Sequence, residues 1–437
     1  MRAIGRKAST FPGLVAIKVC PQFLSAIAKP PVVVCVSGTN GKTTTTNMIA
    51  DCLVADGRTV VTNRAGANIN TGVATALMKG VSLTGKVLSD AAVLEIDEKY
   101  CPLILPFVAP HYLVVTNIFR DSLKRNAHPE FIFDIINSSI PRETTLIINA
   151  DDLGSNQLAP DNTRILYGID ALPSDVETSV NLITDHAACP VCDTLLKHHY
   201  LRYHHIGRSW CPACGFSSPQ PDSSAQVTGS TMVVTTQGEP EDYPVINPLV
   251  FNLYNELAVI CLLRHMGIPS QKVATLMGNL AVTDSRLDET TVGRWTIIQA
   301  MAKGQSAVST TRTLDFVKDT DQPSLVILLL DDYYDRVNTS EFIGWIYDAD
   351  FEFLATDNIR QIAALGPRCD DYIVRLLIAG VDRERIFADR DEFARLNELD
   401  YTDVSRIYLL YDSGTYELAM KVKHAVIAHC KSVGRVP

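Results

Sequence analysis

A glycine-rich turn followed by a lysine and threonines is the stretch that could do chemistry most directly. Its residues are Gly38, Thr39, Asn40, Gly41, Lys42, Thr43 and Thr44. Glycines let backbone N–H groups approach an anion, and a helix beginning at Lys42 adds the partial positive charge of its N-terminus. The lysine would reach the outer phosphates of a nucleotide, and the Thr43 hydroxyl would hold Mg²⁺. The stretch predicts an ATP-binding loop; the alternative is an ordinary glycine-rich turn.

A carboxylate near that loop is the second candidate. The apolar run 91–96 predicts a buried strand, and Glu95 lies near its end. Parallel α/β sheets bind ligands at the carboxyl ends of their strands, and Mg²⁺ prefers a few carboxylates together with phosphate oxygens. We therefore expect Glu95 to be a magnesium ligand; the alternative is a solvated strand end. Asp97 and Glu98 are expected to be surface charges.

Four of the eleven cysteines form two close pairs. Cys189 pairs with Cys192 and Cys211 with Cys214, and 18 residues separate the two pairs. Two such turns predict a Cys₄ zinc ribbon over about 186–217, where metal binding supplies folding energy. A redox dithiol would need only one pair. We expect the four histidines between the pairs to be surface groups, and 217–226 to be a polar linker.

Two asparagines three residues apart open an apolar helix that runs to about residue 265. Asn252 and Asn255 share one face of that helix. An amide offers both a donor and an acceptor, which suits the edge of adenine. The alternative is a helix cap and one surface asparagine.

Elements that could position these residues follow from the hydrophobic pattern. Apolar strands at 32–36, 59–62, 91–96, 112–116 and 145–149 alternate with helices, and predict a mostly parallel α/β sheet. This first domain should span 1–290 and carry the ribbon as an insertion. A second, smaller α/β domain at 291–437 should contain strands at 296–299, 324–330 and 406–410 and helices at 313–318 and 416–428.

Composition narrows the class of protein. The 437 residues carry a net charge of −10, which argues against general nucleic-acid binding. No apolar run approaches the roughly 20 residues that a membrane span needs, and the first residues lack the apolar core of a signal peptide. We expect a cytoplasmic protein.

Taken in order, these motifs resemble a known family. The glycine loop is followed by Thr62-Asn63, Gly66-Ala67-Asn68, Val93–Glu98, Thr116–Asp121, the cysteine pairs and Asn252–Asn255. This series resembles the MurT family, the synthetase subunits of glutamine-hydrolysing lipid II isoglutaminyl synthases, which are relatives of the Mur ligases. The resemblance implies a Mur-ligase-like P-loop domain and a Rossmann-like C-terminal domain.

The resemblance also implies an activity. ATP would phosphorylate the α-carboxylate of D-glutamate in the lipid II stem peptide. Ammonia from a glutamine amidotransferase partner of the GatD type would then displace phosphate. The two chains would form a heterodimer that touches the membrane only through its lipid-linked substrate.

Site residues carry over from the family position by position. Lys42, Thr43, Glu95-bound Mg²⁺ and Arg286 would neutralise charge on the transferred phosphoryl group. Asp348, in the block Trp345–Glu352, would be the acid that completes a catalytic triad with the partner's cysteine and histidine. The alternative is an exposed loop aspartate, and Asp350 and Asp335 are the other candidates for the acid. Two other functions remain possible from the residues: a partner-free Mur-type or folylpolyglutamate-type ligase that adds an amino acid, and a non-catalytic scaffold.

Overall fold

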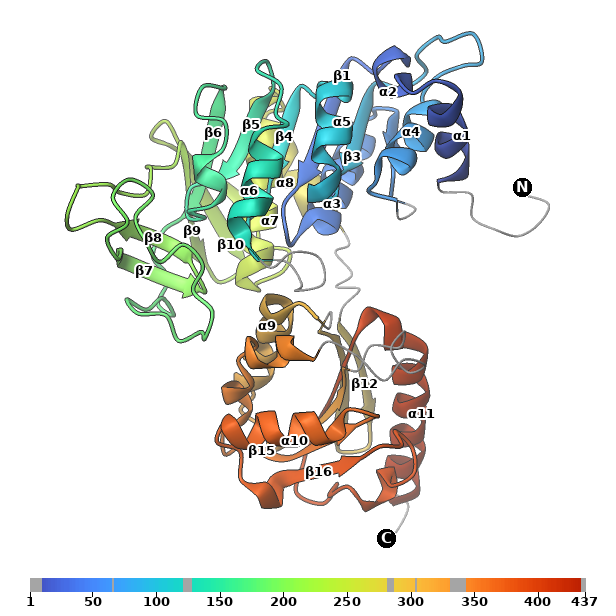
Figure 1. Ribbon diagram of the computed structural model, residues 1–437, viewed down its shortest axis with the longest axis vertical. Coiled ribbons are helices and arrows are strands. Elements are labelled where there is room, and N and C mark those ends of the chain that lie inside the picture. The colour runs from blue at the N-terminus through green and yellow to red at the C-terminus, as the bar shows by residue number, and fades with distance from the viewer. Residues whose placement is uncertain are drawn as a thin grey trace. The chain divides into compact units, whose positions relative to one another are not determined.

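Two compact units make up the chain (Figure 1). The computed structural model describes residues 10–64, 67–120, 128–280, 287–302, 305–330 and 343–433. The first unit takes the described residues up to Arg120, then His128–Val180, then those from Thr184 to 280. The second unit takes Asn181–Ile183 and the described residues from 287 onward.

A nine-stranded sheet is the framework of the first unit. Its strands are β1 Val32–Ser37, β2 Val60–Thr62, β3 Ala91–Glu95, β4 Tyr112–Val115, β5 Thr145–Asn149, β6 Arg164–Ile169, β9 Ser223–Thr228, β10 Thr231–Thr236 and β11 Glu239–Pro244. They lie in the order β11-β10-β9-β6-β5-β4-β1-β3-β2. All neighbours from β9 to β2 pair in parallel, whereas β9, β10 and β11 pair antiparallel. The predicted parallel α/β sheet is thus present, with an antiparallel extension.

Helices cover both faces of this sheet. They are α1 Phe11–Val19, α2 Phe23–Ala26, α3 Lys42–Ala55, α4 Asn70–Lys79, α5 Cys101–Val108, α6 Pro129–Asn137, α7 Val250–His265 and α8 Ser270–Gly278, with 3₁₀ turns at Glu98–Tyr100 and Ser155–Gln157. Side chains of α4, α5 and α6 share one core with Val33 and Leu94 of the sheet. The helices α3 and α7 pack together on the sheet, and α8 packs on both. Central strands are apolar on both faces because each face is covered.

The segment between the cysteine pairs forms its own small sheet. β7 (Lys197–Tyr203) and β8 (Ile206–Trp210) pair antiparallel. Cys189 and Cys211 pack with Leu153 and Leu196 in a separate small core. The predicted linker 217–226 is wrong at its end, because β9 begins at Ser223 and pairs with β6. The sequence pattern does not indicate this strand, because its residues are mostly small and polar and do not alternate between apolar and polar.

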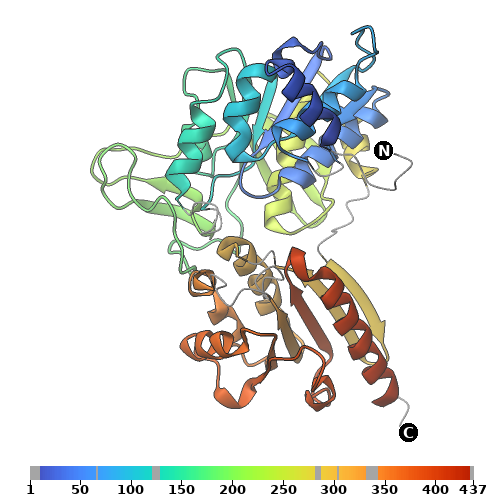
Figure 2. The same ribbon diagram turned by 45° about the vertical axis from the view of Figure 1, so that its right-hand side comes forward.

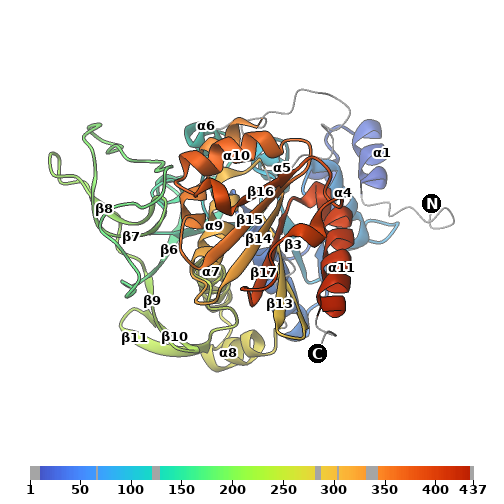
Figure 3. The ribbon, with the colours of Figure 1, turned by 90° about the horizontal axis from the view of Figure 1, so that it is seen from below.

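A six-stranded sheet organises the second unit. Its strands are β12 Leu287–Val292, β13 Trp295–Met301, β14 Ser324–Leu329, β15 Ile359–Leu365, β16 Ile386–Asp389 and β17 Arg406–Tyr411. The order is β12-β13-β17-β14-β15-β16, parallel except for β12 (Figure 3). The sequence pattern missed β12, β15 and β16.

Helices complete the second unit. They are α9 Ala307–Lys318, α10 Cys369–Ile378 and α11 Tyr416–Val433, with 3₁₀ turns at Gly344–Tyr347, Phe351–Leu354, Arg383–Arg385, Leu396–Glu398 and Ser413–Thr415. Leu325 and Ile327 pack toward α11, whereas Val326 and Leu328 pack toward α9 and α10. Figure 2 shows α11 along the sheet beside β12 and β13. Within the described residues, we find no helix both long and apolar enough to cross a membrane.

Candidate functional site: a phosphate loop and a cysteine cluster

The glycine-rich loop leaves the sheet at its centre. It follows β1, which lies between β3 and β4, with Val36 beside Glu95 and Ser37 beside Val115. Gly41 then caps α3 in the left-handed conformation, with φ of 87°, and the helix begins at Lys42. The predicted order of strand, turn and helix is therefore confirmed.

The segment after β4 clamps this loop. Thr39 N donates to the Asn117 carbonyl at 2.8 Å, and Asn40 N donates to Asn117 Oδ1 at 3.0 Å. Thr116 Oγ1 donates to the Asn40 carbonyl at 2.6 Å, and Phe119 N donates to Thr39 Oγ1 at 2.9 Å. Both threonines and both asparagines are buried. The loop is thus held in one shape by its neighbours.

Two glycines make that close approach possible. A β-carbon on Gly38, whose φ is 121°, would lie 2.4 Å from Thr116 Oγ1. A β-carbon on Gly41 would lie 2.4 Å from Asn255 Oδ1. Both contacts are too short for any side chain, and both backbone conformations favour glycine.

Lys42 lies in an ion pair that the sequence pattern missed. Its Nζ donates to Glu98 Oε1 at 2.9 Å, and also to the carbonyls of Gly38 and Thr39. Glu98 and Asp97 are 7 % and 5 % exposed, so the expectation that they are surface charges is wrong. The reason is local: Asp97 caps the 3₁₀ turn that begins at Glu98, and this turn directs Glu98 inward to the lysine.

Polar atoms near the loop fit an anionic ligand. Asn40 Nδ2 and the hydroxyls of Thr45 and Thr46 are buried and have no hydrogen-bond partner among the described residues. Thr43 is exposed at the first turn of α3, and Thr44 is half-buried. Asn40 precedes α3, and an unpaired donor at a helix N-terminus suits a phosphate group, whereas Thr45 and Thr46 lie farther along the helix. A role for the Thr43 hydroxyl in binding Mg²⁺ stays a prediction.

Glu95 lies at the end of β3 under the control of two asparagines. Asn68 Nδ2 donates to Glu95 Oε1 at 3.2 Å. Asn63 exchanges hydrogen bonds with the Glu95 backbone, at 2.8 Å to its carbonyl and 2.9 Å from its N–H. The carboxylate is partly exposed. It can therefore accept a cation while its backbone stays fixed.

Asn255 of α7 lies against Gly41 of the loop, and Asn252 lies beside Asn255. Asn252 and Asn255 are 5 % and 4 % exposed, and Asn255 Nδ2 lies 3.4 Å from Asn252 Oδ1. Leu249 occupies the helix cap, so the alternative of a capping asparagine and a surface one is wrong. A role in binding adenine stays a prediction. Arg286 lies outside the described residues.

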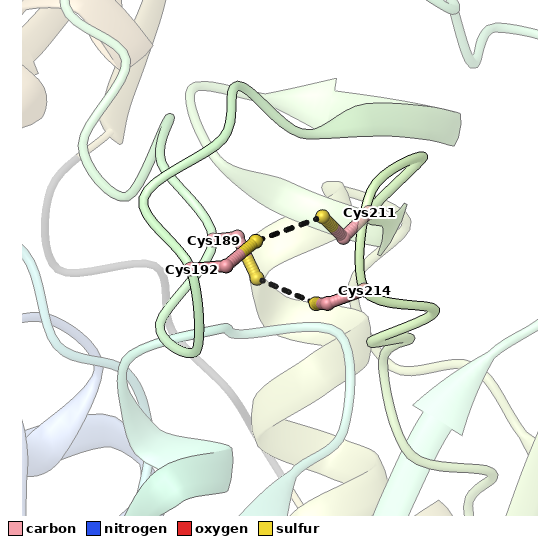
Figure 4. A group of neighbouring side chains, drawn as sticks. All are labelled: Cys189, Cys192, Cys211 and Cys214. Atoms are coloured by element: carbon pink, nitrogen blue, oxygen red, sulfur yellow. Dashed lines mark hydrogen bonds between the residues drawn. The ribbon is translucent and has the colours of Figure 1, made fainter.

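The four cysteines converge on one point (Figure 4). Their sulfur atoms all lie within 4.8 Å of one another, and none is in a disulfide within the described part of the chain. Cys189 Sγ lies 3.6 Å from Cys214 Sγ, and Cys192 Sγ lies 3.5 Å from Cys211 Sγ. Hydrogen bonding with Thr194 lowers the pKa of Cys192 to about 6. Four clustered thiols of this kind can hold a metal ion; zinc stays a prediction.

The histidines between the cysteine pairs are not all surface groups. His204 and His205 are 1 % and 3 % exposed, contrary to expectation. His205 Nε2 lies 2.9 Å from Asp152 Oδ1 and makes a buried ion pair or hydrogen bond with it. The burial arises because the hairpin β7–β8 packs its turn into the first unit, which composition alone does not indicate.

Asp348 lies in the second unit, after the 3₁₀ turn Gly344–Tyr347. It is half-buried and follows the exposed Tyr347. Arg375 of α10 fixes this segment, donating to the Ile346 carbonyl at 2.8 Å and the Ala349 carbonyl at 2.7 Å.

Neither of the other two candidates for the acid, Asp350 and Asp335, is supported as an interface residue. Asp350 is only 1 % exposed, and its carboxylate accepts from Leu182 N at 2.6 Å and Asn181 Nδ2 at 2.9 Å. It is a buried anchor, because those two donors already occupy it. Asp335 lies outside the described residues.

Comparisons with known proteins agree with this arrangement. Residues 36–211 match the family model Mur ligase middle domain, and residues 306–416 match the model MurT ligase C-terminal. The chain is 30% identical over 406 residues to the lipid II isoglutaminyl synthase (glutamine-hydrolyzing) subunit MurT of Staphylococcus aureus, covering 92% of this chain and 90% of that protein. It is 29% identical over 412 residues to the subunit of the same name from Streptococcus pneumoniae, with the same two coverages.

A solved structure shares the fold. The pseudomurein peptide ligase type C from Methanothermus fervidus superposes with a TM-score of 0.69 at 19% identity, covering 92% of this chain and 80% of that one. The likeness of the solved structure concerns the fold, whereas the sequence relatives extend over nearly the whole chain. The chain therefore belongs to the MurT family of the Mur ligases.

Proposed function

We propose that this chain is the ATP-dependent synthetase subunit of a lipid II isoglutaminyl synthase. The observation that carries the proposal is the glycine-rich loop, in which Gly41 caps α3 and the unpaired Asn40 Nδ2 lies just before the helix N-terminus, in a chain 30% identical to a subunit of that name. The substrate is the D-glutamate α-carboxylate of the stem peptide, and the product is D-isoglutamine.

The reaction joins carbon to nitrogen in two steps. A carboxylate oxygen attacks the γ-phosphorus of ATP, and ADP leaves. Ammonia then attacks the carbonyl carbon of the acyl phosphate, phosphate leaves, and the nitrogen loses a proton. Both steps move negative charge, so fixed positive groups and donors supply most of the rate enhancement.

Residues of the first unit, together with Arg286, divide this work. Lys42 would leave its carbonyl contacts and Glu98 for the outer phosphates, and the N–H groups at the start of α3 would bind phosphate oxygens. Thr43 and Glu95 would hold Mg²⁺, which suits oxygen ligands. Asn252 and Asn255 would contact the adenine, and Arg286 would add positive charge at the γ-phosphate.

Ammonia requires a second protein. None of the roles above includes a nucleophile for glutamine hydrolysis, and the relatives are named as subunits. A glutamine amidotransferase of the GatD type would supply a cysteine and a histidine. Asp348 would orient that histidine across the interface of a heterodimer, which is the usual role of the acid in such a triad.

Reconstitution with purified components tests the proposal. The chain alone should amidate lipid II, or a soluble precursor, with ATP and ammonium, as followed by mass spectrometry of the peptide. Glutamine should replace ammonium only when the glutaminase partner is present. Addition of a free amino acid without the partner would favour the amino-acid ligase instead. Absence of ADP release with every substrate would favour a scaffold.

A further inference from the structure

The hairpin between the cysteine pairs is anchored in the first unit by a buried arginine. Arg202 of β7 has a side chain only 1 % exposed. Its Nη1 donates to Asp151 Oδ2 at 2.9 Å, and its Nη2 donates to the carbonyls of Ile169 and Asp170, each at 2.6 Å. Nε donates to Asp175 Oδ1 at 3.2 Å. Every nitrogen of the guanidinium is therefore used inside the unit.

One route leads from this arginine to the phosphate loop through α7. Arg202 Nη1 also contacts the Tyr254 hydroxyl, which itself donates to Asp151 Oδ2 at 2.7 Å. Tyr254 precedes Asn255, whose Oδ1 occupies the space beside Gly41. The hairpin thus fixes the turn of α7 that lies against the loop.

A second route starts at the hairpin turn. His205 Nε2 lies 2.9 Å from Asp152 Oδ1, and Asp152 Oδ2 accepts from Ile118 N at 2.8 Å. The His205 ring also lies 4.4 Å from the Phe119 ring, between centroids. Phe119 N donates to Thr39 Oγ1 in the loop. Both routes therefore end on the same loop, one on Thr39 and one on Gly41.

Burying several charges to attach a small hairpin is costly, and an apolar contact of the same size would attach it equally well. Charged hydrogen bonds are directional, so what they add is a fixed position of the hairpin relative to the residues that it contacts. We propose that Arg202 and His205 are positioning residues for nucleotide binding, so that closing the cysteine cluster on a metal ion tightens the phosphate loop around ATP. This inference rests on the proposed function, because it requires the loop to bind ATP.

Four variants separate positioning from general stability. Tyr254→Phe removes only the hydroxyl between Arg202 and α7, and His205→Phe keeps a ring against Phe119 but loses the bond to Asp152. His205→Gln restores a donor. Tyr200→Phe is the matched control, because its hydroxyl donates to the Ile169 carbonyl and its ring lies 4.7 Å from the same guanidinium, but it is not on α7.

Calorimetric titration of the reduced, zinc-loaded full chain with ATP and Mg²⁺ is the measurement. Tyr254→Phe and His205→Phe should each raise the Kd about three- to ten-fold, the effect of one lost hydrogen bond. His205→Gln should recover most of the affinity, and Tyr200→Phe should stay within about two-fold of wild type. Zinc content and melting temperature are measured for each variant, and each variant should remain folded and zinc-loaded at the temperature of the titration. Removing zinc from the wild type with a chelator should also weaken ATP binding.

Three results would overturn the inference. Equal ATP affinity in wild type, Tyr254→Phe and His205→Phe would show that neither route matters. An equal loss in Tyr200→Phe would point to a general effect of the hairpin. Unchanged ATP affinity after zinc removal would show that the cluster does not influence the loop. This result comes from the wild type, so it holds even if a variant fails to fold. A wild type that binds no ATP would instead overturn the proposed function, and this inference with it.

Discussion

Gly41 illustrates how closely single residues fit around the phosphate loop. A β-carbon there would collide with Asn255 Oδ1, and the φ of 87° is one that side chains rarely adopt. Asn255 can approach this near only because position 41 is glycine. The pairing of a loop glycine with a helix asparagine explains why both residue types occur in the site.

At this scale, Lys42→Ala should reduce ATP hydrolysis on the order of 100-fold or more, because a charge aimed at the transferring phosphoryl group is lost. The fold should persist, but the free energy of unfolding should fall by about 1–3 kcal/mol because Glu98 loses its cation. Steady-state ADP release and thermal melting are the measurements.

Two further variants sharpen that prediction. Lys42→Ala combined with Glu98→Gln should recover the melting temperature without recovering activity. Lys79→Ala, an exposed lysine on α4, should leave both unchanged. Turnover at the wild-type rate in Lys42→Ala would show that the loop has been assigned wrongly.

Among the elements, the β7–β8 hairpin lies between the two cysteine pairs of the cluster. A small apolar core near the hairpin joins Cys189, Cys211 and Leu196 to Leu153, which follows β5. Segments of this size usually need a metal or a disulfide to hold their shape. A metal ion bound by the four thiols would supply that stabilisation.

We therefore expect one Zn²⁺ per chain in freshly purified, reduced protein. Cys192→Ser should release the metal and make about 187–216 more susceptible to proteolysis, because one of four thiolate ligands is lost. Cys20→Ser, a partly exposed cysteine outside the cluster, is the matched control. Elemental analysis that finds no zinc in the wild type would contradict this prediction.

The buried His186, which precedes the cluster, should make the stability of the fold depend on pH. Burial, with a smaller effect of His205, lowers the pKa of His186 from 6.5 to about 4. Between these values the unfolded chain binds more protons than the folded chain. The stabilisation is thus fully present above about pH 6.5 and is lost as the pH falls toward 4, with about 2 kcal/mol gone at pH 5.

His186→Asn should make the free energy of unfolding less dependent on pH in this window. Asparagine is chosen because position 186 has a φ of 58°, which asparagine tolerates. Urea unfolding at pH 7.5 and pH 5 would measure the change in both proteins. An identical loss of stability in wild type and variant would mean that His186 titrates normally in the fold.

For the whole molecule, the chain order does not follow the two units. Asn181–Ile183 lies between segments of the first unit in sequence but belongs to the second. Leu182 N and Asn181 Nδ2 bind the buried Asp350, and Ile183 joins the core that contains Trp345. Three parts of the second unit therefore hold the segment that carries Asp348: α9, α10 and the segment Asn181–Ile183.

At this scale, Asp348→Asn should greatly reduce glutamine-dependent amidation by the two-subunit complex, on the order of 100-fold or more, because the partner's histidine loses its orienting charge. Amidation with added ammonium should remain, since the ATP site is untouched. Asp403→Asn, an exposed aspartate of the same unit, is the control. Equal loss of both activities would place Asp348 in the synthetase site, and loss of neither would leave it without a role.

Features encoded in contiguous residues could be predicted from the sequence. The phosphate loop, the cysteine pairs and the central apolar strands depend on glycine conformation, ligand spacing and hydrophobic runs, which are local properties. Lys42 and Cys189 were recognisable for that reason, and the structure places Lys42 at the start of α3 directly after the loop and Cys189 in the cluster.

Other features depended on partners far away in the chain. Glu98 is buried because it pairs with Lys42, which lies 56 residues earlier in the chain. Arg202 is buried because it contacts Asp151 and Tyr254, which belong to other parts of the fold. Asp350 is buried because Leu182, 168 residues earlier, caps it. A charged side chain is buried only where the fold supplies its counter-charge and hydrogen bonds. No local pattern records that supply, so only the tertiary structure decided which charges are internal.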